Sequence, residues 1–175
     1  QPGDCLMISR KPTGTLLISD VHPGKVLYLL STGTGMAPFL ATIKDPETYE
    51  RFEHIVLVHG VRYAKDLAYA DYIRKELPNH EYLGEQISRQ LHYVPVVSRE
   101  PFALHGRVTD LLENGEIPRS LGFAPLNPET DRAMICGGPQ MLADFRKILD
   151  SRGFKASSKI GQPGHYVFER AFVEK

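Results

Sequence analysis

Apolar runs of strand length alternate with segments of helical periodicity along most of this chain. The strand-like runs are Val26–Leu30, His54–His59, His92–Val97, Ala133–Cys136 and Tyr166–Phe172, and the helix-like segments are Ala37–Lys44, Lys65–Leu77, Val108–Asn114 and Gln140–Arg152. Strands that are apolar throughout are typical of a parallel sheet, which is buried on both faces. The alternation therefore predicts an α/β fold, a five-stranded, parallel, doubly wound (Rossmann-like) sheet with helices on both faces.

The first 24 residues have a different pattern. Residues 5–10 and 15–19 read as two short β-strands on either side of the turn Lys11–Gly14, and the change to the α/β pattern follows Pro23-Gly24. We therefore divide the chain into an N-terminal β part, 1–24, and a sheet domain, 25–175. The chain does not begin with Met, and Gln1–Asp4 reads as a turn between elements. We expect a fragment of a longer protein.

Composition narrows the class of protein. The 175 residues hold 42% hydrophobic and 24% charged side chains, and 21 basic residues balance 21 acidic ones. This balance offers no general attraction to nucleic acid or to an anionic membrane. Since the sequence has neither a signal peptide nor an apolar run of membrane-spanning length, we expect a cytoplasmic protein. The two cysteines and the spacing of the seven histidines predict no metal site.

The junction after the first strand carries the clearest chemical signal. Ser31-Thr-Gly-Thr-Gly-Met-Ala-Pro38 leads from a strand into a helix, and glycines there let a backbone approach a phosphate closely. It is not the dinucleotide fingerprint GxGxxG, because Pro38 occupies the third glycine position. Two interpretations stay open: a nucleotide contact, or a tight turn that needs glycine for backbone reasons alone.

Ligands of open α/β sheets bind at the carboxyl ends of the strands. There the second predicted strand leads to Arg62, where an NAD-preferring protein would usually carry an acid. The third strand is followed by Ser98, Arg99 and Arg107. Guanidinium groups suit the 2′-phosphate that distinguishes NADP from NAD, so the pattern favours NADP. The alternative is that these arginines are simply solvated at the ends of loops.

The last two predicted strands offer weaker signals. Cys136, before Gly137-Gly-Pro139, is either a small buried hydrophobic residue or a neighbour of a nicotinamide ring. Phe172 is either a core residue or an aromatic cover for a flat cofactor ring, and Glu169 could handle a proton on the same face.

Taken together, these motifs resemble the ferredoxin–NADP⁺ reductase family, in particular its bacterial branch. The stretches that carry the resemblance are STGTGMAPF, HGVR, SRE with an arginine eight residues later, ICGGPQM and the final ERAFVEK. They occur in the order that the family has, and the resemblance extends over nearly the whole chain. It implies an FAD-binding antiparallel barrel followed by an NADP-binding sheet, with residues 1–20 similar only to the last strands of that barrel.

The resemblance also implies roles for individual residues. Arg62, Ser98, Arg99 and Arg107 resemble the set that holds the 2′-phosphate, and Thr32, Gly33, Thr34 and Gly35 resemble the stretch beneath the pyrophosphate and nicotinamide. Cys136 and Gly137 resemble the lining of the nicotinamide pocket. Ala171 and Phe172 resemble the bacterial replacement for a terminal tyrosine over the flavin, and Glu169 the carboxylate beside it. Cys136, Glu169 and Phe172 are thus the candidate catalytic residues.

The function implied is hydride transfer between NADPH and FAD, with single electrons passed to ferredoxin or flavodoxin. The main alternative is an NADP-binding fragment without activity of its own, because most of the FAD-binding barrel is missing from the sequence. The reductase component of an oxygenase or of a flavohaemoglobin shares the sheet motifs, but the ending ERAFVEK favours the stand-alone bacterial reductases. Members of the family are mostly monomeric, and the surfaces left uncovered here would promote self-association.

Overall fold

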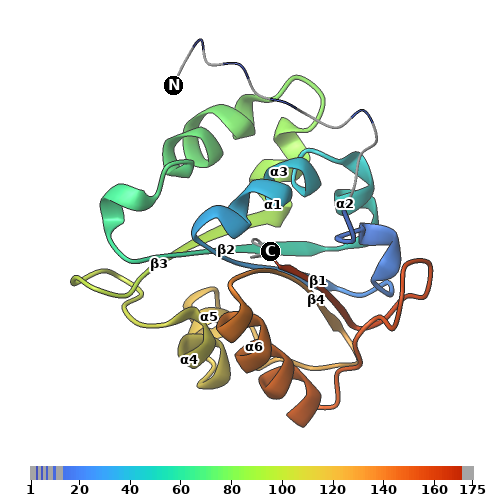
Figure 1. The fold of residues 1–175 in the computed structure, drawn as a ribbon. Helices are drawn as coiled ribbons and strands as arrows, with labels where there is room; N and C mark the ends of the chain where they lie inside the picture. The colour runs from blue at the N-terminus through green and yellow to red at the C-terminus, as the bar shows by residue number, and fades with distance from the viewer. Residues whose placement is uncertain (1–2, 4, 6, 8–9, 11–13, 171–175) are drawn as a thin grey trace.

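The computed structural model describes residues 3, 5, 7, 10 and 14–170. Its centre is a five-stranded sheet in the order β3-β2-β1-β4-β5, with all neighbouring strands parallel (Figure 1). The strands are β1 (Val26–Thr32), β2 (His54–Val61), β3 (Leu91–Val97), β4 (Asp131–Gly137) and β5 (Tyr166–Arg170). The predicted doubly wound parallel sheet is confirmed, and each strand matches a predicted apolar run.

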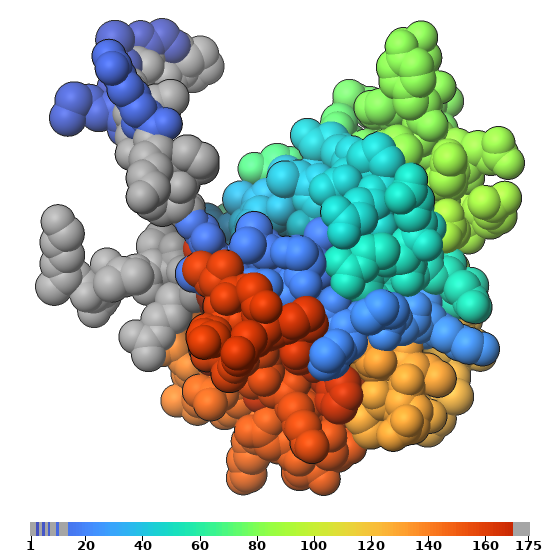
Figure 2. All heavy atoms as spheres, turned by 90° about the vertical axis from the view of Figure 1, so that its right-hand side faces the viewer, coloured from blue at the N-terminus to red at the C-terminus, as the bar shows by residue number. Residues whose placement is uncertain are grey.

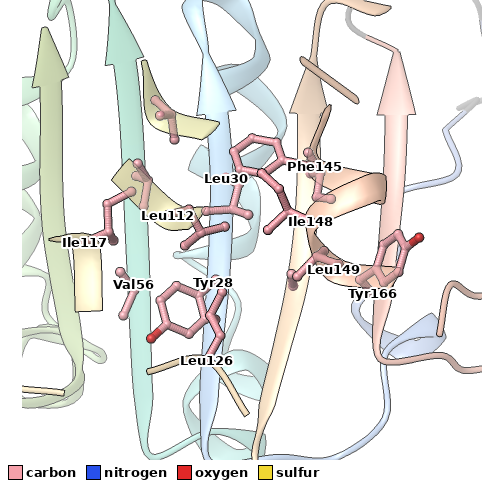
Figure 3. Packing of buried hydrophobic residues seen from close by; sticks show 14 of the residues in the cluster. Tyr28, Leu30, Val56, Leu112, Ile117, Leu126, Phe145, Ile148, Leu149 and Tyr166 are labelled. Carbon is pink, nitrogen blue, oxygen red and sulfur yellow. The ribbon is translucent and has the colours of Figure 1, made fainter. Parts of the chain in front are cut away.

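Helices cover both faces of the sheet because successive side chains of each strand point to opposite faces. One face packs against α1 (Ala37–Thr42), α2 (Pro46–Arg51) and α3 (Gly84–Gln90), and the other against α4 (Val108–Glu113), α5 (Glu116–Ser120) and α6 (Pro139–Ser151). On the second face, Tyr28 and Leu30 of β1 lie among Leu112 and Phe145 in a closely packed core (Figure 3). Two buried cores thus fix the sheet from either side.

The segment 65–77, predicted as one helix, is broken into short pieces. The structure has the 3₁₀ turns η3 (Ala64–Asp66) and η5 (Leu77–Asn79), with a single π-helical turn, η4 (Tyr72–Glu76), between them. Pro78 provides the physical reason for the late break, because proline has no N–H to donate to the carbonyl of the preceding turn and its ring crowds that turn. The prediction of a continuous helix was wrong here.

The N-terminal segment contains no strand at 15–19, where the sequence predicted one. A 3₁₀ turn, η1 (Ile18–Asp20), stands there instead, and Val21 forms an isolated parallel bridge with Gly164. Half of the predicted strand 5–10, residues 6, 8 and 9, lies outside the described residues. Leu16 and Ile18 pack against the core beneath α1, so local burial replaces the expected barrel pairing. In Figure 2 this blue segment lies against the orange-red loop before β5.

None of the helices in the described part of the chain is long and apolar enough to cross a membrane.

Candidate functional site

A cavity of about 570 Å³ opens at the carboxyl ends of four of the five strands. Its lining comes from the segments that follow β1, β2, β3 and β4, together with side chains of α4 and α6. It includes six of the residues predicted from sequence: Thr32, Gly33, Thr34, Arg62, Ser98 and Arg107. The strand order reverses between β1 and β4, which is where open α/β sheets bind their ligands.

The end of β1 forms the floor of this cavity. Gly33 has a φ of +53° and opens the 3₁₀ turn η2 (Gly33–Met36), with no neighbouring atom within 4 Å of where a Cβ would stand. Gly35 is different: its own Cβ position would overlap the backbone carbonyl of Cys136. The two glycines therefore have different structural roles. The absence of a side chain at Gly33 leaves the cavity open, and its absence at Gly35 lets the turn pack against β4.

Arg62 and Ser98 are brought together by backbone hydrogen bonds between the loops after β2 and β3. Ser98 N donates to Val61 O at 3.1 Å, and Arg99 N donates to Arg62 O at 3.0 Å. Glu100 Oε1 accepts from Ala64 N at 2.5 Å and fixes the same two loops a little farther on. Arg99 is exposed and does not line the cavity, although its backbone holds the loop that presents Arg62.

Arg107 stands at the start of α4 and reaches across to α6. Its Nη2 lies 3.0 Å from Asp144 Oδ2, and Gln140 Nε2 donates to the other oxygen of that carboxylate at 2.8 Å. Arg107 is still 60% exposed, so the ion pair is a surface one. In this arrangement an anion entering the cavity would meet a guanidinium that already has an acidic partner.

Some lining residues were not singled out from sequence: Gly60, Asp66, Gly106, Thr109 and Met141 are examples. Gly60 and Met141 lie within the quoted stretches HGVR and ICGGPQM, so the signal was present. A Cβ on Gly60 would overlap Val108 and approach Thr32 Cγ2 to 3.0 Å. Met141 accepts a hydrogen bond from Thr32 Oγ1 through its sulfur at 2.8 Å. Asp66 and Thr109 had no motif to mark them.

Gly137 supports the cavity from behind. A Cβ there would overlap the Met141 sulfur and come within 2.9 Å of Thr32 Oγ1. Glycine at this position thus allows β1, β4 and α6 to meet closely.

Cys136 and Glu169 lie together but do not line the cavity. They are register partners on β4 and β5, and Cys136 belongs to the core beneath α1. Its side chain is 3% exposed, and burial, with a smaller contribution from Glu169, raises the pKa of the thiol to about 11. The thiol is therefore neutral at pH 7 and is a poor nucleophile.

The Glu169 carboxylate accepts hydrogen bonds from Thr15, at 2.9 Å from the backbone nitrogen and 3.3 Å from the hydroxyl. Ala171 and Phe172, the other candidates near the end of β5, lie outside the described residues.

Comparison with known proteins shows which family the chain resembles. The family described as "Oxidoreductase NAD-binding domain" matches residues 29–147. The chain is 60% identical to a ferredoxin–NADP reductase of Pseudomonas aeruginosa and 56% identical to one of Azotobacter vinelandii, in each case over 99% of this chain and 67% of the relative. The chain thus spans about two thirds of the length of these relatives.

A solved structure gives the same result in three dimensions. The crystal structure of a ferredoxin NADP⁺ reductase from Neisseria gonorrhoeae with bound FAD and NADP superimposes with a TM-score of 0.77 at 34% sequence identity. The match covers 91% of this chain and 61% of that chain.

Proposed function

Because this chain belongs to the bacterial ferredoxin–NADP reductase family, as its NAD-binding domain, we propose that it binds NADP(H) in the cavity at the ends of β1 to β4. The observation that carries the proposal is the convergence of Arg62, Ser98 and Arg107 on one cavity whose floor is the glycine turn after β1. Phosphate recognition needs donors in fixed positions together with a backbone that an anion can approach closely.

The arginines provide the selectivity for NADP over NAD. A 2′-phosphate is a dianion that accepts forked hydrogen bonds, and guanidinium groups donate such bonds in matching geometry. Arg62 and Ser98 are fixed relative to each other by the backbone bonds between their loops. Arg107 leaves Asp144 to join them. Arg99, being exposed beside Arg62, adds positive charge at the mouth.

The turn after β1 holds the other end of the ligand. Gly33 leaves space above the backbone, while Thr32 and Thr34 line the cavity with hydroxyl groups beside it. The N-terminal end of α6, beginning at Pro139 after Gly138, adds backbone N–H groups on the same side. When bound, the nicotinamide supplies a hydride. The chain's own residues orient the dinucleotide and neutralise the charge of its phosphates.

In the full-length protein, we infer, the hydride passes to FAD and single electrons pass to ferredoxin or flavodoxin. This part of the proposal rests on the names of the relatives, whose reductases act on those carriers. Cys136 and Glu169 would then lie on the flavin side, while the role of Ala171 and Phe172 as a cover of the flavin ring stays a prediction from the sequence. The neutral thiol of Cys136 serves as a small apolar contact there, and the Glu169 carboxylate provides a proton-handling group.

The test of the cavity is nucleotide binding by the isolated chain. Isothermal titration with NADP⁺ and NAD⁺ should give much tighter binding of NADP⁺. Arg62→Ala and Arg107→Ala should each weaken NADP⁺ binding at least tenfold, because each loses a charge-assisted hydrogen bond worth about 1.5–3 kcal/mol, and leave NAD⁺ binding nearly unchanged.

Arg89→Ala is the matched control, since Arg89 is an exposed arginine of α3 paired with Glu85 on the same helix. It should leave both affinities unchanged. Equal losses of NADP⁺ and NAD⁺ in the Arg62 and Arg107 variants would contradict the assignment of the 2′-phosphate site.

The shorter length of the chain favours a second candidate, an NADP-binding domain without reductase activity. The chain spans only about two thirds of the length of these relatives, and residues 14–24 pack on the sheet domain instead of forming barrel strands. Purified chain mixed with FAD should then stay colourless after gel filtration while still binding 2′,5′-ADP. A yellow protein that reduces a dye with NADPH would instead establish reductase activity in this chain alone.

A further inference from the structure

Two histidines form a close pair at the end of the sheet opposite the cavity. His54 opens β2, and His92 lies near the start of β3. Their ring nitrogens, His54 Nδ1 and His92 Nε2, are 3.2 Å apart, and the ring centroids are 5.3 Å apart. Both side chains are half-buried, so the pair is accessible to solvent but is not fully exposed.

In this structure, one imidazole donates a hydrogen bond to the other across this distance. The same spacing also suits two ligands of one metal ion, which would take the place of the shared proton. Two nitrogens that are each about 2.0–2.1 Å from Zn²⁺ lie roughly 2.9 Å apart at a right angle and roughly 3.4 Å apart at the tetrahedral angle. The observed 3.2 Å falls between these values. Both imidazoles can turn a lone pair to the same point by carrying their protons on the outer nitrogens, His54 Nε2 and His92 Nδ1.

The surroundings hold the two rings in this arrangement. Phe123 contacts both, with centroid distances of 4.9 Å to His54 and 5.2 Å to His92. The loop that carries Phe123 is itself fixed, because Phe123 N donates to Pro118 O at 2.9 Å.

We propose that His54 and His92 form a binding site for a divalent transition-metal ion of the Zn²⁺ type. Imidazole nitrogens suit Zn²⁺, Cu²⁺ and Ni²⁺, and do not suit Mg²⁺ or Ca²⁺. Among the described residues, no group of three His, Cys, Asp or Glu side chains could hold a metal ion, so water completes the coordination here. The site is thus an open one with two protein ligands.

This site is separate from the nucleotide cavity. His54 is six residues before Gly60 on β2, which at about 3.3 Å per residue is roughly 20 Å along the strand. Metal binding and nucleotide binding can therefore be measured independently, and failure of one assignment would not affect the other.

The experiment is isothermal titration of the chain with ZnCl₂, in a buffer that does not chelate metals, next to a titration with MgCl₂. One Zn²⁺ should bind per chain, and Mg²⁺ should not bind. His54→Asn and His92→Asn should each weaken Zn²⁺ binding at least tenfold. The matched control is His22→Asn, because His22 also has a histidine neighbour, His165, at a centroid distance of 5.8 Å.

Two further readouts keep the result interpretable. In the unaltered chain, the imidazole NMR signals of His54 and His92 should move on adding Zn²⁺ and return on adding EDTA. Urea unfolding and 2′,5′-ADP binding should show that the variants are folded. Unchanged Zn²⁺ affinity in folded His54→Asn or His92→Asn protein, or Zn²⁺-dependent shifts confined to other histidines, would overturn the proposal.

Discussion

The Arg107 side chain is positioned for an anion in the cavity, but it already has an acidic partner. It lines the cavity, but in this structure its guanidinium pairs with Asp144 at 3.0 Å. Gln140 holds the same carboxylate from the other side. The pair limits where Arg107 points, and it also sets an acidic competitor against any phosphate that approaches.

Removal of that competitor should strengthen binding of NADP⁺. Asp144→Asn keeps the size of the side chain and its hydrogen bond to Gln140, but removes the negative charge. We expect the dissociation constant for NADP⁺ to fall about two- to fivefold, since exposed ion pairs are worth about 0.2–1 kcal/mol. Titration with NADP⁺ measures it, and weaker binding would mean that Asp144 positions Arg107 more than it competes.

The burial of His59 should make the free energy of unfolding depend on pH. It is 2% exposed, its Nδ1 lies 3.0 Å from the Tyr93 hydroxyl, and burial lowers its pKa from 6.5 to about 4. Between these values the unfolded chain binds a proton that the folded chain does not. The contribution to stability is therefore complete above pH 6.5 and is lost as the pH falls towards 4.

Urea unfolding at a series of pH values checks this. His59→Gln should flatten the fall in stability between pH 6.5 and 4 by roughly 3 kcal/mol at most. The exposed His105 provides the control, as His105→Gln should leave the slope as it is in the unaltered chain. A slope that is the same in the His59 variant would contradict a neutral buried imidazole.

At the scale of elements, the strands and the helices α1, α4 and α6 could be predicted from sequence, whereas α2, α3 and α5 could not. The five strands stand out because both faces of a parallel sheet are buried, which produces apolar runs. Helices α2, α3 and α5 have seven residues or fewer and therefore show little helical period. The equally short α1 was predicted because it follows the glycine junction after β1. For α2 a local signal existed: Asp45, before Pro46, caps the helix by accepting from Glu47 N at 3.0 Å.

The candidate site was predicted in part for the same reason. Residues directly after strands, such as Arg62 and Ser98, are placed by the topology alone. Thr109 and Met141 depend on how α4 and α6 pack on the sheet, which a single sequence does not specify. Cys136 and Glu169 lie near the carboxyl ends of β4 and β5 rather than after them, and Cys136 belongs to the core on the opposite face from Val108 and Met141.

The contact between β2 and α4 is one that a single methyl group should disturb. Gly60→Ala would set a Cβ against the buried Val108 and near Thr32, so α4 would have to move away from the sheet. Overpacking of this kind costs about 1–3 kcal/mol. We expect a lower urea midpoint and weaker NADP⁺ binding. Gly138→Ala is the control, because a Cβ there meets no atom within 4 Å, and its stability should change little.

At the scale of the whole molecule, the two ends of the described chain are joined by a buried carboxylate. Asp20 is 2% exposed, and its Oδ1 accepts from Gly161 N at 2.8 Å, across 141 residues of sequence. Arg51 adds hydrogen bonds to the carbonyls of Ile18 and Val21. The segment 14–24 is thereby held by side-chain hydrogen bonds to α2 and to the loop before β5.

Loss of this contact should destabilise the whole domain. Asp20→Ala removes the acceptor of Gly161 N–H, and the loss of an intramolecular hydrogen bond of this kind costs about 0.5–1.5 kcal/mol. Thermal or urea unfolding should show a single transition at lower temperature or denaturant concentration. Asp71→Ala removes an exposed pair with Lys75 and should cost less than about 0.5 kcal/mol. Similar losses in both variants would argue against the role given to Asp20.

The order of strands in the sheet also determines when the protein can fold during synthesis. β1 is central, and one of its two partners, β4, begins at Asp131, more than a hundred residues after Val26. At about 5–20 residues per second, a ribosome needs roughly 5–20 s to make that stretch. Throughout this interval the nascent chain carries an apolar strand with one open edge. Such an edge can pair with strands of other chains and lead to aggregation. Protection by chaperones during synthesis should therefore matter more for this protein than for one whose neighbouring strands follow one another in sequence.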